Sequence, residues 1–360
     1  MPAVRRFRSG KWSVALLDFR QQVRALPKAE LHLHLEGSIA PETARELAAR
    51  HGVRLTIEEV RERYQFKDFL GFLNAFKWVT SFLRTPQDYA LITERLCGEL
   101  RAQNVVYAEI TQSTGVSLWR KQDALANFAA MRDIAEQQRP RGLQIQWIFD
   151  ATRQFGPGPA MEVARIAVQA KLAGVVAFGM GGDELALPAE PFQEVFDFAA
   201  GQGLRRVAHA GEVGSPDQIR AAIEILGAER IGHGIAAMHD LRLQRLLAER
   251  KIPLEVCPTS NICTGALARQ LGTNAAGLQE HPLAELYRRQ IPVVLSTDDP
   301  AMFHTTIGEE YEAAATAMGL SAEETCDLAE MSFEYAFLPT REKSELLGHF
   351  HAAKKSLGLV

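Results

Sequence analysis

The sequence predicts a (β/α)8 barrel, the TIM-barrel architecture, and two observations lead to this fold class. Short runs of β-type residues, each bounded by Gly, Pro or polar residues, alternate with helical patterns, which is typical of repeated βα units. Eight such runs occur within 360 residues, and this number favours a closed barrel over an open doubly wound sheet. The length alone also admits two smaller domains, but we interpret residues 1–360 as a single barrel domain.

The expected strands are separated by segments with helical patterns. They span residues 30–35, 105–110, 145–149, 175–178, 206–209, 230–233, 254–257 and 293–297. Two of the helices between them begin with a capping box, Ser215 with Gln218 and Ser321 with Glu324. Gly227 is expected to end the first of these helices.

The connection between the first two strands, about residues 37–104, is too long for a single crossover and must hold several helices. Five phenylalanines recur in it at largely helical spacing. Two interpretations stay open: the rings are ordinary core residues, or they form an apolar lid over the barrel mouth. The five residues are Phe66, Phe69, Phe72, Phe76 and Phe82.

Composition and charge exclude several classes of protein. With 47% apolar and 23% charged residues, the chain is not disordered, collagen-like or a coiled coil. A net charge of −4, with its most basic stretch confined to residues 5–11, predicts no nucleic-acid partner. Four cysteines without C-x-x-C spacing indicate reduced thiols and a cytoplasmic protein. The N-terminus lacks a signal-peptide core and no apolar run approaches the roughly 20 residues that span a bilayer, so we expect no membrane contact.

Reactive side chains collect at the carboxyl ends of the expected strands, where barrels of this class place their active sites. Four of the ten histidines fall there, and the last strand leads directly into two adjacent aspartates. These residues are His32, His34, His209, His233, Asp298 and Asp299. The other six histidines, His281 among them, fall in helices or loops, and we interpret them as structural.

His32 and His34 form a His-x-His pair, and strand alternation places both imidazoles on the same face, which is the interior of a barrel. Such pairs also occur on solvated strands. His209 and Asp298, at the ends of the fifth and eighth strands, would complete a set of three imidazole nitrogens and one carboxylate oxygen. This donor set suits zinc, so the sequence predicts one metal site.

Neighbouring residues are candidates for proton transfer. Glu212, one short turn past His209, could be a proton donor if the site raises its pKa, or it is a solvated loop residue. His233 lies between two glycines that leave room for a ligand or water, and a buried core histidine is the alternative. Asp299 would orient a water or substrate while Asp298 binds metal, unless the pair is a solvated acidic turn.

The glycine-rich segment at residues 179–182 matches neither a P-loop nor a dinucleotide fingerprint, so we reject a phosphate-binding loop. Glycines at a barrel mouth let backbone N–H groups approach a flat ligand, although a plain tight turn needs the same residues. No G-x-S-x-G motif occurs, and serine hydrolase chemistry has little support.

Six stretches together resemble the adenosine deaminase family of metal-dependent amidohydrolases. They read L-P-K-A-E-L-H-L-H-L-E-G at 26–37, G-D-E at 182–184, H-A-G-E at 209–212, R-I-G-H-G at 230–234, C-P-T-S-N at 257–261 and S-T-D-D-P at 296–300. They run in the family's order, so the resemblance covers nearly the whole chain. It implies that His32, His34, His209 and Asp298 bind one zinc ion per chain and that Glu212 protonates purine N1.

The same resemblance implies further roles. His233 and Asp299 would orient and activate the zinc-bound water, and the N–H of Gly182 would face purine N3. Many amidohydrolases hold a second metal through a carboxylated lysine at the end of the fourth strand. Here that strand ends in A-F-G at 177–179, which favours a single metal.

Three departures from the family pattern bear on the substrate. Glu36 stands where adenosine deaminases generally carry an aspartate that contacts the ribose, and this glutamate is similar to that of adenine deaminases. With Gly182 and Asp299, Glu36 is expected to contact the substrate. The second strand ends in E-I-T-Q-S at 109–113 and the fourth in G-M-G-G at 179–182, both unlike the common family motifs. We therefore predict C6 deamination of a small-molecule 6-aminopurine nucleoside, adenosine or 6-amino-6-deoxyfutalosine. Free adenine as substrate and a catalytically inactive purine-binding protein are the alternatives.

Overall fold

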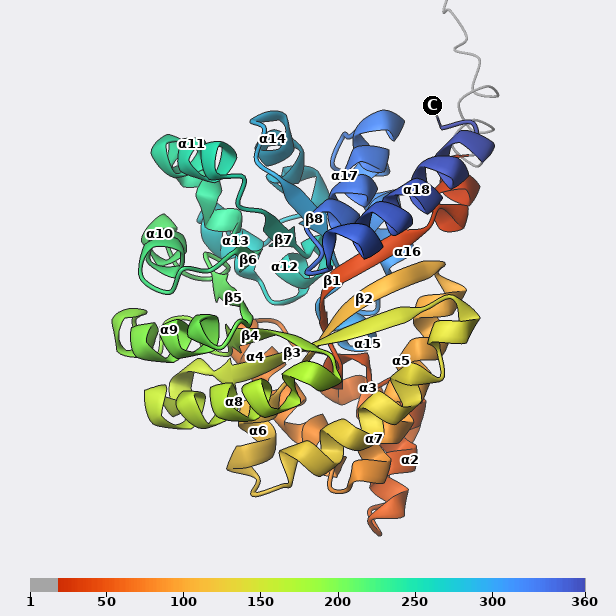
Figure 1. Ribbon diagram of the computed structural model, residues 1–360, viewed down its shortest axis with the longest axis vertical. Helices are drawn as coiled ribbons and strands as arrows, with labels where there is room; N and C mark the ends of the chain where they lie inside the picture. Colours follow the sequence, from red (N-terminus) through yellow and green to blue (C-terminus); the bar gives the residue numbers. More distant parts are fainter. Residues whose placement is uncertain (1–18, 360) are drawn as a thin grey trace, which may run out of the picture.

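The computed structural model describes residues 19–359, and it consists of an eight-stranded parallel barrel surrounded by helices (Figure 1). The strands pair in sequence order, and all eight expected strands are present, which confirms the (β/α)8 fold. They are β1 (Lys28–His34), β2 (Val105–Gln112), β3 (Gln144–Thr152), β4 (Val175–Gly181), β5 (Arg205–Ala210), β6 (Arg230–His233), β7 (Leu254–Val256) and β8 (Val293–Leu295). The basic stretch at residues 5–11 lies outside the described residues.

The barrel closes between β1 and the segment just beyond β8. Leu33 and Asp298 form a parallel bridge there. The N–H of Asp298 donates to the carbonyl of His32 at 3.0 Å, and the N–H of His34 donates to the carbonyl of Asp298 at 2.8 Å. Asp298 adopts a left-handed backbone conformation with φ of 68°, which aspartate tolerates better than most residues. The closing contacts are therefore made by residues that sequence analysis placed in the metal site.

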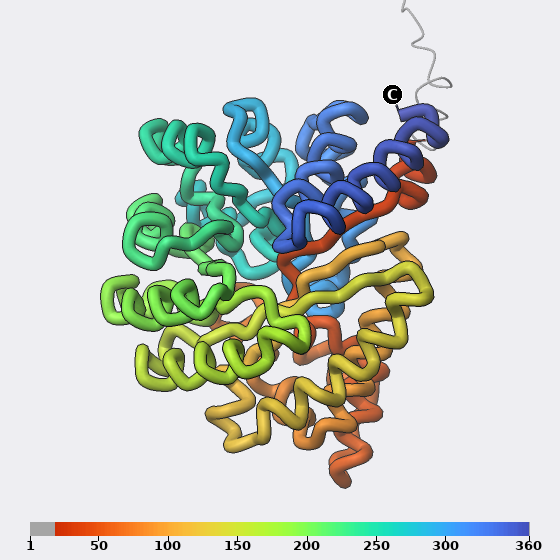
Figure 2. The backbone as a smooth tube through the Cα atoms, viewed as in Figure 1, coloured from red at the N-terminus to blue at the C-terminus, as the bar shows by residue number. Residues whose placement is uncertain are grey.

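Helices follow the strands around the outside of the barrel, and the trace of the chain passes from strand to helix and back (Figures 1 and 2). Both capping boxes occur, at the starts of α10 and α17, but α10 ends earlier than expected, at Glu224. The helices after β2 are α6 (Thr114–Trp119), α7 (Ala124–Glu136), α8 (Pro157–Ala170), α9 (Gln193–Gly201), α10 (Pro216–Glu224), α11 (Leu241–Arg250), α12 (Pro258–Cys263), α13 (Ala266–Leu271), α14 (Leu283–Arg288), α15 (Pro300–Phe303), α16 (Ile307–Thr316), α17 (Ala322–Glu334) and α18 (Thr340–Ser356).

The long connection between β1 and β2 holds four α-helices, as expected: α2 (Pro41–Arg50), α3 (Ile57–Arg63), α4 (Phe69–Val79) and α5 (Pro86–Ala102). Three of its phenylalanine rings, those of Phe66, Phe69 and Phe76, pack around the ring of Phe72 at centroid distances of 5.6 to 6.1 Å. Phe72 is buried, whereas the other three keep partial exposure. The rings are thus partly core, and the lid interpretation stays a prediction.

Two further observations concern the cysteines and the composition of the helices. All four cysteines are free thiols, and none forms a disulfide in the described part of the chain. None of the helices within residues 19–359 combines the length and apolar composition needed to span a membrane.

Candidate active site

A cavity of about 320 Å³ opens at the carboxyl ends of the strands. Most of the site residues expected from the sequence line it, while His32 lies just beneath and Glu36 lies outside its wall. The expected residues in the wall are His34, Gly182, His209, Glu212, His233, Asp298 and Asp299. Gly182 follows β4 in a left-handed conformation with φ of 92°, which brings its backbone to the cavity surface.

Three imidazoles, two from β1 and one from β5, lie near the carboxylate of Asp298. Nε2 of His34 lies 3.3 Å from Nε2 of His209 and 3.3 Å from Oδ1 of Asp298, and Nε2 of His32 lies 3.4 Å from the same oxygen. Four ligands placed tetrahedrally at about 2.0–2.1 Å from a zinc ion stand about 3.3–3.4 Å apart. These three of the six separations in such a set match those edges, and Asp298 is the group that both His32 and His34 contact.

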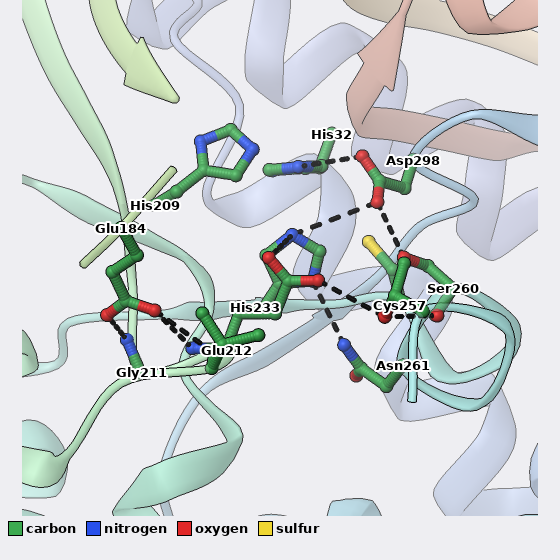
Figure 3. A network of polar contacts seen from close by, with 12 residues as sticks. His32, Glu184, His209, Gly211, Glu212, His233, Cys257, Ser260, Asn261 and Asp298 are labelled. Atoms are coloured by element: carbon green, nitrogen blue, oxygen red, sulfur yellow. Dashed lines mark hydrogen bonds and ion pairs between the residues drawn. The ribbon is translucent and has the colours of Figure 1, made fainter. Parts of the chain in front are cut away.

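Asp298 belongs to two groups of potential ligands whose donor atoms all lie within 4.8 Å of one another. One group consists of Asp298 with His32, His209 and His233, all of which are labelled in Figure 3, and the other of Asp298 with His34 and Asp299. Nε2 of His32 is buried without a hydrogen-bond partner, as expected of an atom meant for a metal. The structure thus brings together all six residues, including His233 and Asp299, which sequence analysis placed outside the ligand set.

The Nδ1 atoms of His32 and His209 lie within hydrogen-bond distance of other groups. Nδ1 of His32 lies 2.7 Å from Oε2 of Glu255, and Nδ1 of His209 lies 3.2 Å from the carbonyl of Met180. Protons on these Nδ1 atoms leave the Nε2 atoms free for a metal, which is the usual arrangement behind metal-binding histidines.

Burial controls the protonation of these rings. It lowers the pKa of His34 to about 4 and that of His209 well below its usual range, and neutral imidazole is the form that binds metal. His32 differs: although burial lowers its pKa, the neighbouring carboxylates of Asp298 and Glu255 outweigh that effect and raise the pKa to about 10. A metal ion would therefore have to displace a proton from Nε2 of His32.

A buried ion-pair network extends from Glu255 through the barrel interior, and sequence analysis missed it. Nε of Arg230 lies 2.5 Å from Oε1 of Glu255, and Nη2 lies 2.6 Å from Oε2 of Glu109. The ring of Phe337 lies 3.7 Å from the guanidinium. All three charged side chains are at most 1% exposed. Charged residues within otherwise apolar strand runs were the available signal.

The turn that carries Glu212 is held by Glu184. One carboxylate accepts hydrogen bonds from the N–H groups of four successive residues at 211–214, including Glu212 at 3.1 Å (Figure 3). Gly211 is required in this turn because its φ is 71° and a Cβ would overlap the side chain of Ile219. Burial, reinforced by the charge of Asp298, raises the pKa of Glu212 well above its usual value. The carboxyl therefore keeps its proton to higher pH than an ordinary glutamate.

A chain of hydrogen bonds fixes the tautomer of His233. The N–H of Leu283 donates to Nδ1 of His281 at 3.2 Å, so neutral His281 carries its proton on Nε2 and donates it to Oδ1 of Asn261 at 3.2 Å. Nδ2 of Asn261 then donates to Nδ1 of His233 at 3.2 Å (Figure 3). His233 must therefore carry its proton on Nε2. His281, expected to be merely structural, thus lies behind the site.

Nε2 of His233 faces the cavity. It lies 3.7 Å from Oε2 of Glu212 and 3.8 Å from Oδ2 of Asp298. Burial lowers the pKa of His233 to about 3, so the ring is neutral near pH 7. This arrangement presents an N–H donor toward the carboxyl groups and any small molecule between them.

Of the two acidic residues expected to contact the substrate, Asp299 lines the cavity and Glu36 does not. Asp299 lines the cavity, and the absence of a side chain at Gly37 makes room for its carboxyl, because a Cβ there would overlap it. Oε1 of Glu36, by contrast, accepts from the N–H of Ser113 at 3.0 Å, and the side chain is only 1% exposed. The chain turns into a 3-10 helix (Glu36–Ser38) after β1, which directs Glu36 away from the cavity wall.

The adenosine deaminase sequence model matches residues 27–353. The chain therefore belongs to the adenosine deaminase family and is a deaminase, which confirms the resemblance seen in the sequence motifs.

Two curated relatives and one solved structure are similar to this chain over most of its length. The chain is 38% identical to aminodeoxyfutalosine deaminase of Streptomyces coelicolor over 335 residues, covering 91% of this chain and 84% of that protein. It is 35% identical to adenine deaminase of Rhizobium meliloti over 332 residues, covering 91% and 98%. Among solved structures, adenine deaminase from Arthrobacter aurescens superposes with a TM-score of 0.85 at 30% identity, covering 92% of this chain and 99% of that one.

Proposed function

We propose that the protein hydrolyses the C6 amino group of a 6-aminopurine nucleoside, using one zinc ion per chain, and that 6-amino-6-deoxyfutalosine is its preferred substrate. The observation that carries this proposal is the meeting of His34, His209 and Asp298 with the buried carboxyl of Glu212 in one cavity. A metal-binding set beside a carboxyl that holds its proton suits the addition of water to an aromatic ring.

His32, His34, His209 and Asp298 would hold the zinc ion, which when bound supplies Lewis-acid activation of water. Glu212 would donate its proton to ring N1 while the water oxygen adds to C6. Protonation at N1 prevents negative charge from building up on the ring as aromaticity is lost. The burial of Glu212 supports this role because a carboxyl must keep its proton to donate it.

The remaining residues would position the reactants. The Nε2–H of His233 would donate a hydrogen bond to the attacking oxygen, and Asp299 would accept a proton from it. The N–H of Gly182 would face N3 of the purine. The proton that Asp299 takes from the water would pass to the C6 amino group, which leaves as ammonia. The remaining hydroxyl proton would return to Glu212, so that the product carries an oxygen at C6 and a proton at N1.

Two observations support aminodeoxyfutalosine as the substrate. The cavity continues outward to Trp119 on α6, which a free base at the inner end would leave unfilled. The relative from Streptomyces coelicolor that carries this activity in its name is 38% identical over 91% of the chain.

The test is an ammonia-release assay of metal-loaded protein against aminodeoxyfutalosine, adenosine, 2′-deoxyadenosine and adenine, compared by kcat/KM. We expect aminodeoxyfutalosine to be deaminated most efficiently. Adenine as the best substrate would favour the alternative suggested by the adenine deaminase relatives. No ammonia release from any of the four compounds, with one metal ion per chain present, would overturn the proposal and favour a purine-binding protein.

A further inference from the structure

We infer that the outer part of the cavity is a second subsite, in which Trp119, Phe155 and Lys77 bind a flat, negatively charged group at the far end of the substrate. This inference rests on the proposed function, because it assumes that the aminated ring occupies the inner end. It assigns recognition of the substituent to residues remote from the reacting atoms.

The cavity has a polar inner end and an apolar outer end. All four of its acidic residues, Asp150, Glu212, Asp298 and Asp299, come from the ends of β3, β5 and β8 or the turns after them. The outer wall comes from α4, α6 and the turn after β3, and it is dominated by aromatic and aliphatic side chains. A ligand that fills the whole cavity must therefore carry its ring nitrogens at one end and an apolar surface at the other.

Trp119 and Phe155 form an aromatic platform in the outer wall. Trp119 ends α6, and Phe155 ends a 3-10 helix (Arg153–Phe155) that follows β3. Their rings stack at a centroid distance of 5.9 Å and an interplanar angle of 23°. Trp119 nevertheless stays 52% exposed, so much of its surface is open to a ligand. A flat aromatic group packed on this surface gains both apolar burial and ring stacking.

Lys77, on α4, supplies the charge. It is the sole lysine or arginine among the described residues that line the cavity, and its Nζ lies 5.4 Å from the centre of the Trp119 ring. Within residues 19–359, no carboxylate lies within 4.0 Å of this ammonium group. Lys77 is therefore available to pair with an anion on the ligand.

The second cation near the platform is already engaged. The guanidinium of Arg120 lies 5.6 Å from the centre of the Trp119 ring, but its Nη2 donates to the carbonyl of Lys77 at 2.9 Å and to Oγ1 of Thr80 at 3.2 Å. These bonds hold the end of α4 against α6. Arg120 thus fixes the position of Lys77 relative to the aromatic platform.

The distribution of charge also sets the direction of binding. Among the described lining residues, the inner end offers an anionic group no lysine or arginine, whereas at the outer end such a group meets Lys77. Attraction to this ammonium group therefore favours the orientation with the amine toward Glu212. A flat platform beside one ammonium group suits an aromatic carboxylate.

Kinetics with two substrates test the subsite. Aminodeoxyfutalosine carries a carboxylated phenyl ring at the end of its 5′ substituent, and adenosine ends in a hydroxyl group. We expect Lys77→Gln and Trp119→Ala each to raise KM for aminodeoxyfutalosine about tenfold, with kcat little changed, since a charge-assisted contact is worth about one such factor. Both variants should leave KM for adenosine within about twofold. Lys67→Gln, at an exposed lysine outside the cavity, is the matched control.

The outcomes separate the subsite from the proposed function. If the wild type deaminates aminodeoxyfutalosine but the two variants affect both substrates equally or neither, the subsite is wrong and the function stands. If the wild type releases no ammonia, the function fails, and binding is measured instead by titrating tryptophan fluorescence with aminodeoxyfutalosine. Affinity about tenfold weaker in Lys77→Gln than in Lys67→Gln would still support the subsite, and equal affinity would overturn it.

Discussion

Exchange of Asn261 for aspartate changes the tautomer of His233 without changing the size of the side chain. Nδ2 of Asn261 donates to Nδ1 of His233, and this bond places the ring proton on Nε2, facing the cavity. Aspartate has no donor when ionised, so it can only accept. In Asn261→Asp the neutral imidazole must turn its proton toward residue 261 and present a bare Nε2 to the site. His281 can still donate to the new carboxylate.

The expected loss of activity in Asn261→Asp follows from the groups that Nε2 of His233 faces. It lies 3.7 Å from Oε2 of Glu212 and 3.8 Å from Oδ2 of Asp298, so a lone pair would replace an N–H donor beside two carboxyl oxygens. A hydrogen bond to a charged group contributes about 1.5–3 kcal/mol, and proton-transfer groups contribute about 10²–10⁴-fold. We expect kcat to fall about a hundredfold at pH 8.

The direction of the pH dependence in Asn261→Asp follows from the pKa of His233. In the wild type, burial lowers the pKa of His233 to about 3, and the ring stays neutral throughout the assay range. A carboxylate at residue 261 raises this pKa because it stabilises the imidazolium. Below the raised pKa the ring carries both protons and again donates from Nε2. Activity of the variant should therefore recover at low pH and disappear as pH rises through the new pKa.

The assay measures kcat between about pH 5 and pH 8, where histidine charge changes matter, together with metal content. Asn274→Asp, at an exposed asparagine, controls for the added charge. Wild-type kcat at pH 8 in Asn261→Asp with a full complement of metal would refute the assignment of an Nε2–H donor to His233.

Three other substitutions test the remaining parts of the site. Glu212→Gln should lower kcat/KM by about a hundredfold or more and keep its metal, because this residue is assigned proton transfer alone; loss of metal would contradict that role. His34→Ala should fail to retain metal after dialysis, as metal analysis would show, and full retention would remove it from the ligand set. Arg230→Met leaves the buried carboxyl groups of Glu109 and Glu255 without their cation and should lower the free energy of unfolding by about 3–5 kcal/mol in urea titrations. An unchanged midpoint would show that the network is not needed for stability.

The barrel and the histidine cluster were predictable because both depend on simple periodicity. Alternation along β1 sends His32 and His34 to the same face, and parallel strands bring their carboxyl ends together. Glu36 illustrates where this reasoning stops. It continues the period of the two histidines, but the strand ends at His34 and the following 3-10 helix redirects the side chain.

The sequence has no periodic pattern that predicts contacts between irregular segments. Asn261 lies in α12 and His281 in the loop before α14, and no periodic pattern relates the two residues. The pairing of Arg230 with Glu109 and Glu255 depends on how three separate strands are staggered across the barrel interior, which local sequence does not encode. Residues that orient the site were therefore missed more often than residues that form it.

The seam between β1 and the segment after β8 couples metal uptake to folding. His32, His34 and Asp298 make its backbone hydrogen bonds and also carry side chains proposed to bind zinc. Such an ion would bind only when the two ends of the barrel are joined, so its binding free energy adds to the stability of the whole fold. The metal would act as a clasp between the beginning and the end of the barrel. Chelation should then lower the melting temperature, and the amides of His34 and Asp298 should be the first in the barrel to lose protection from hydrogen exchange.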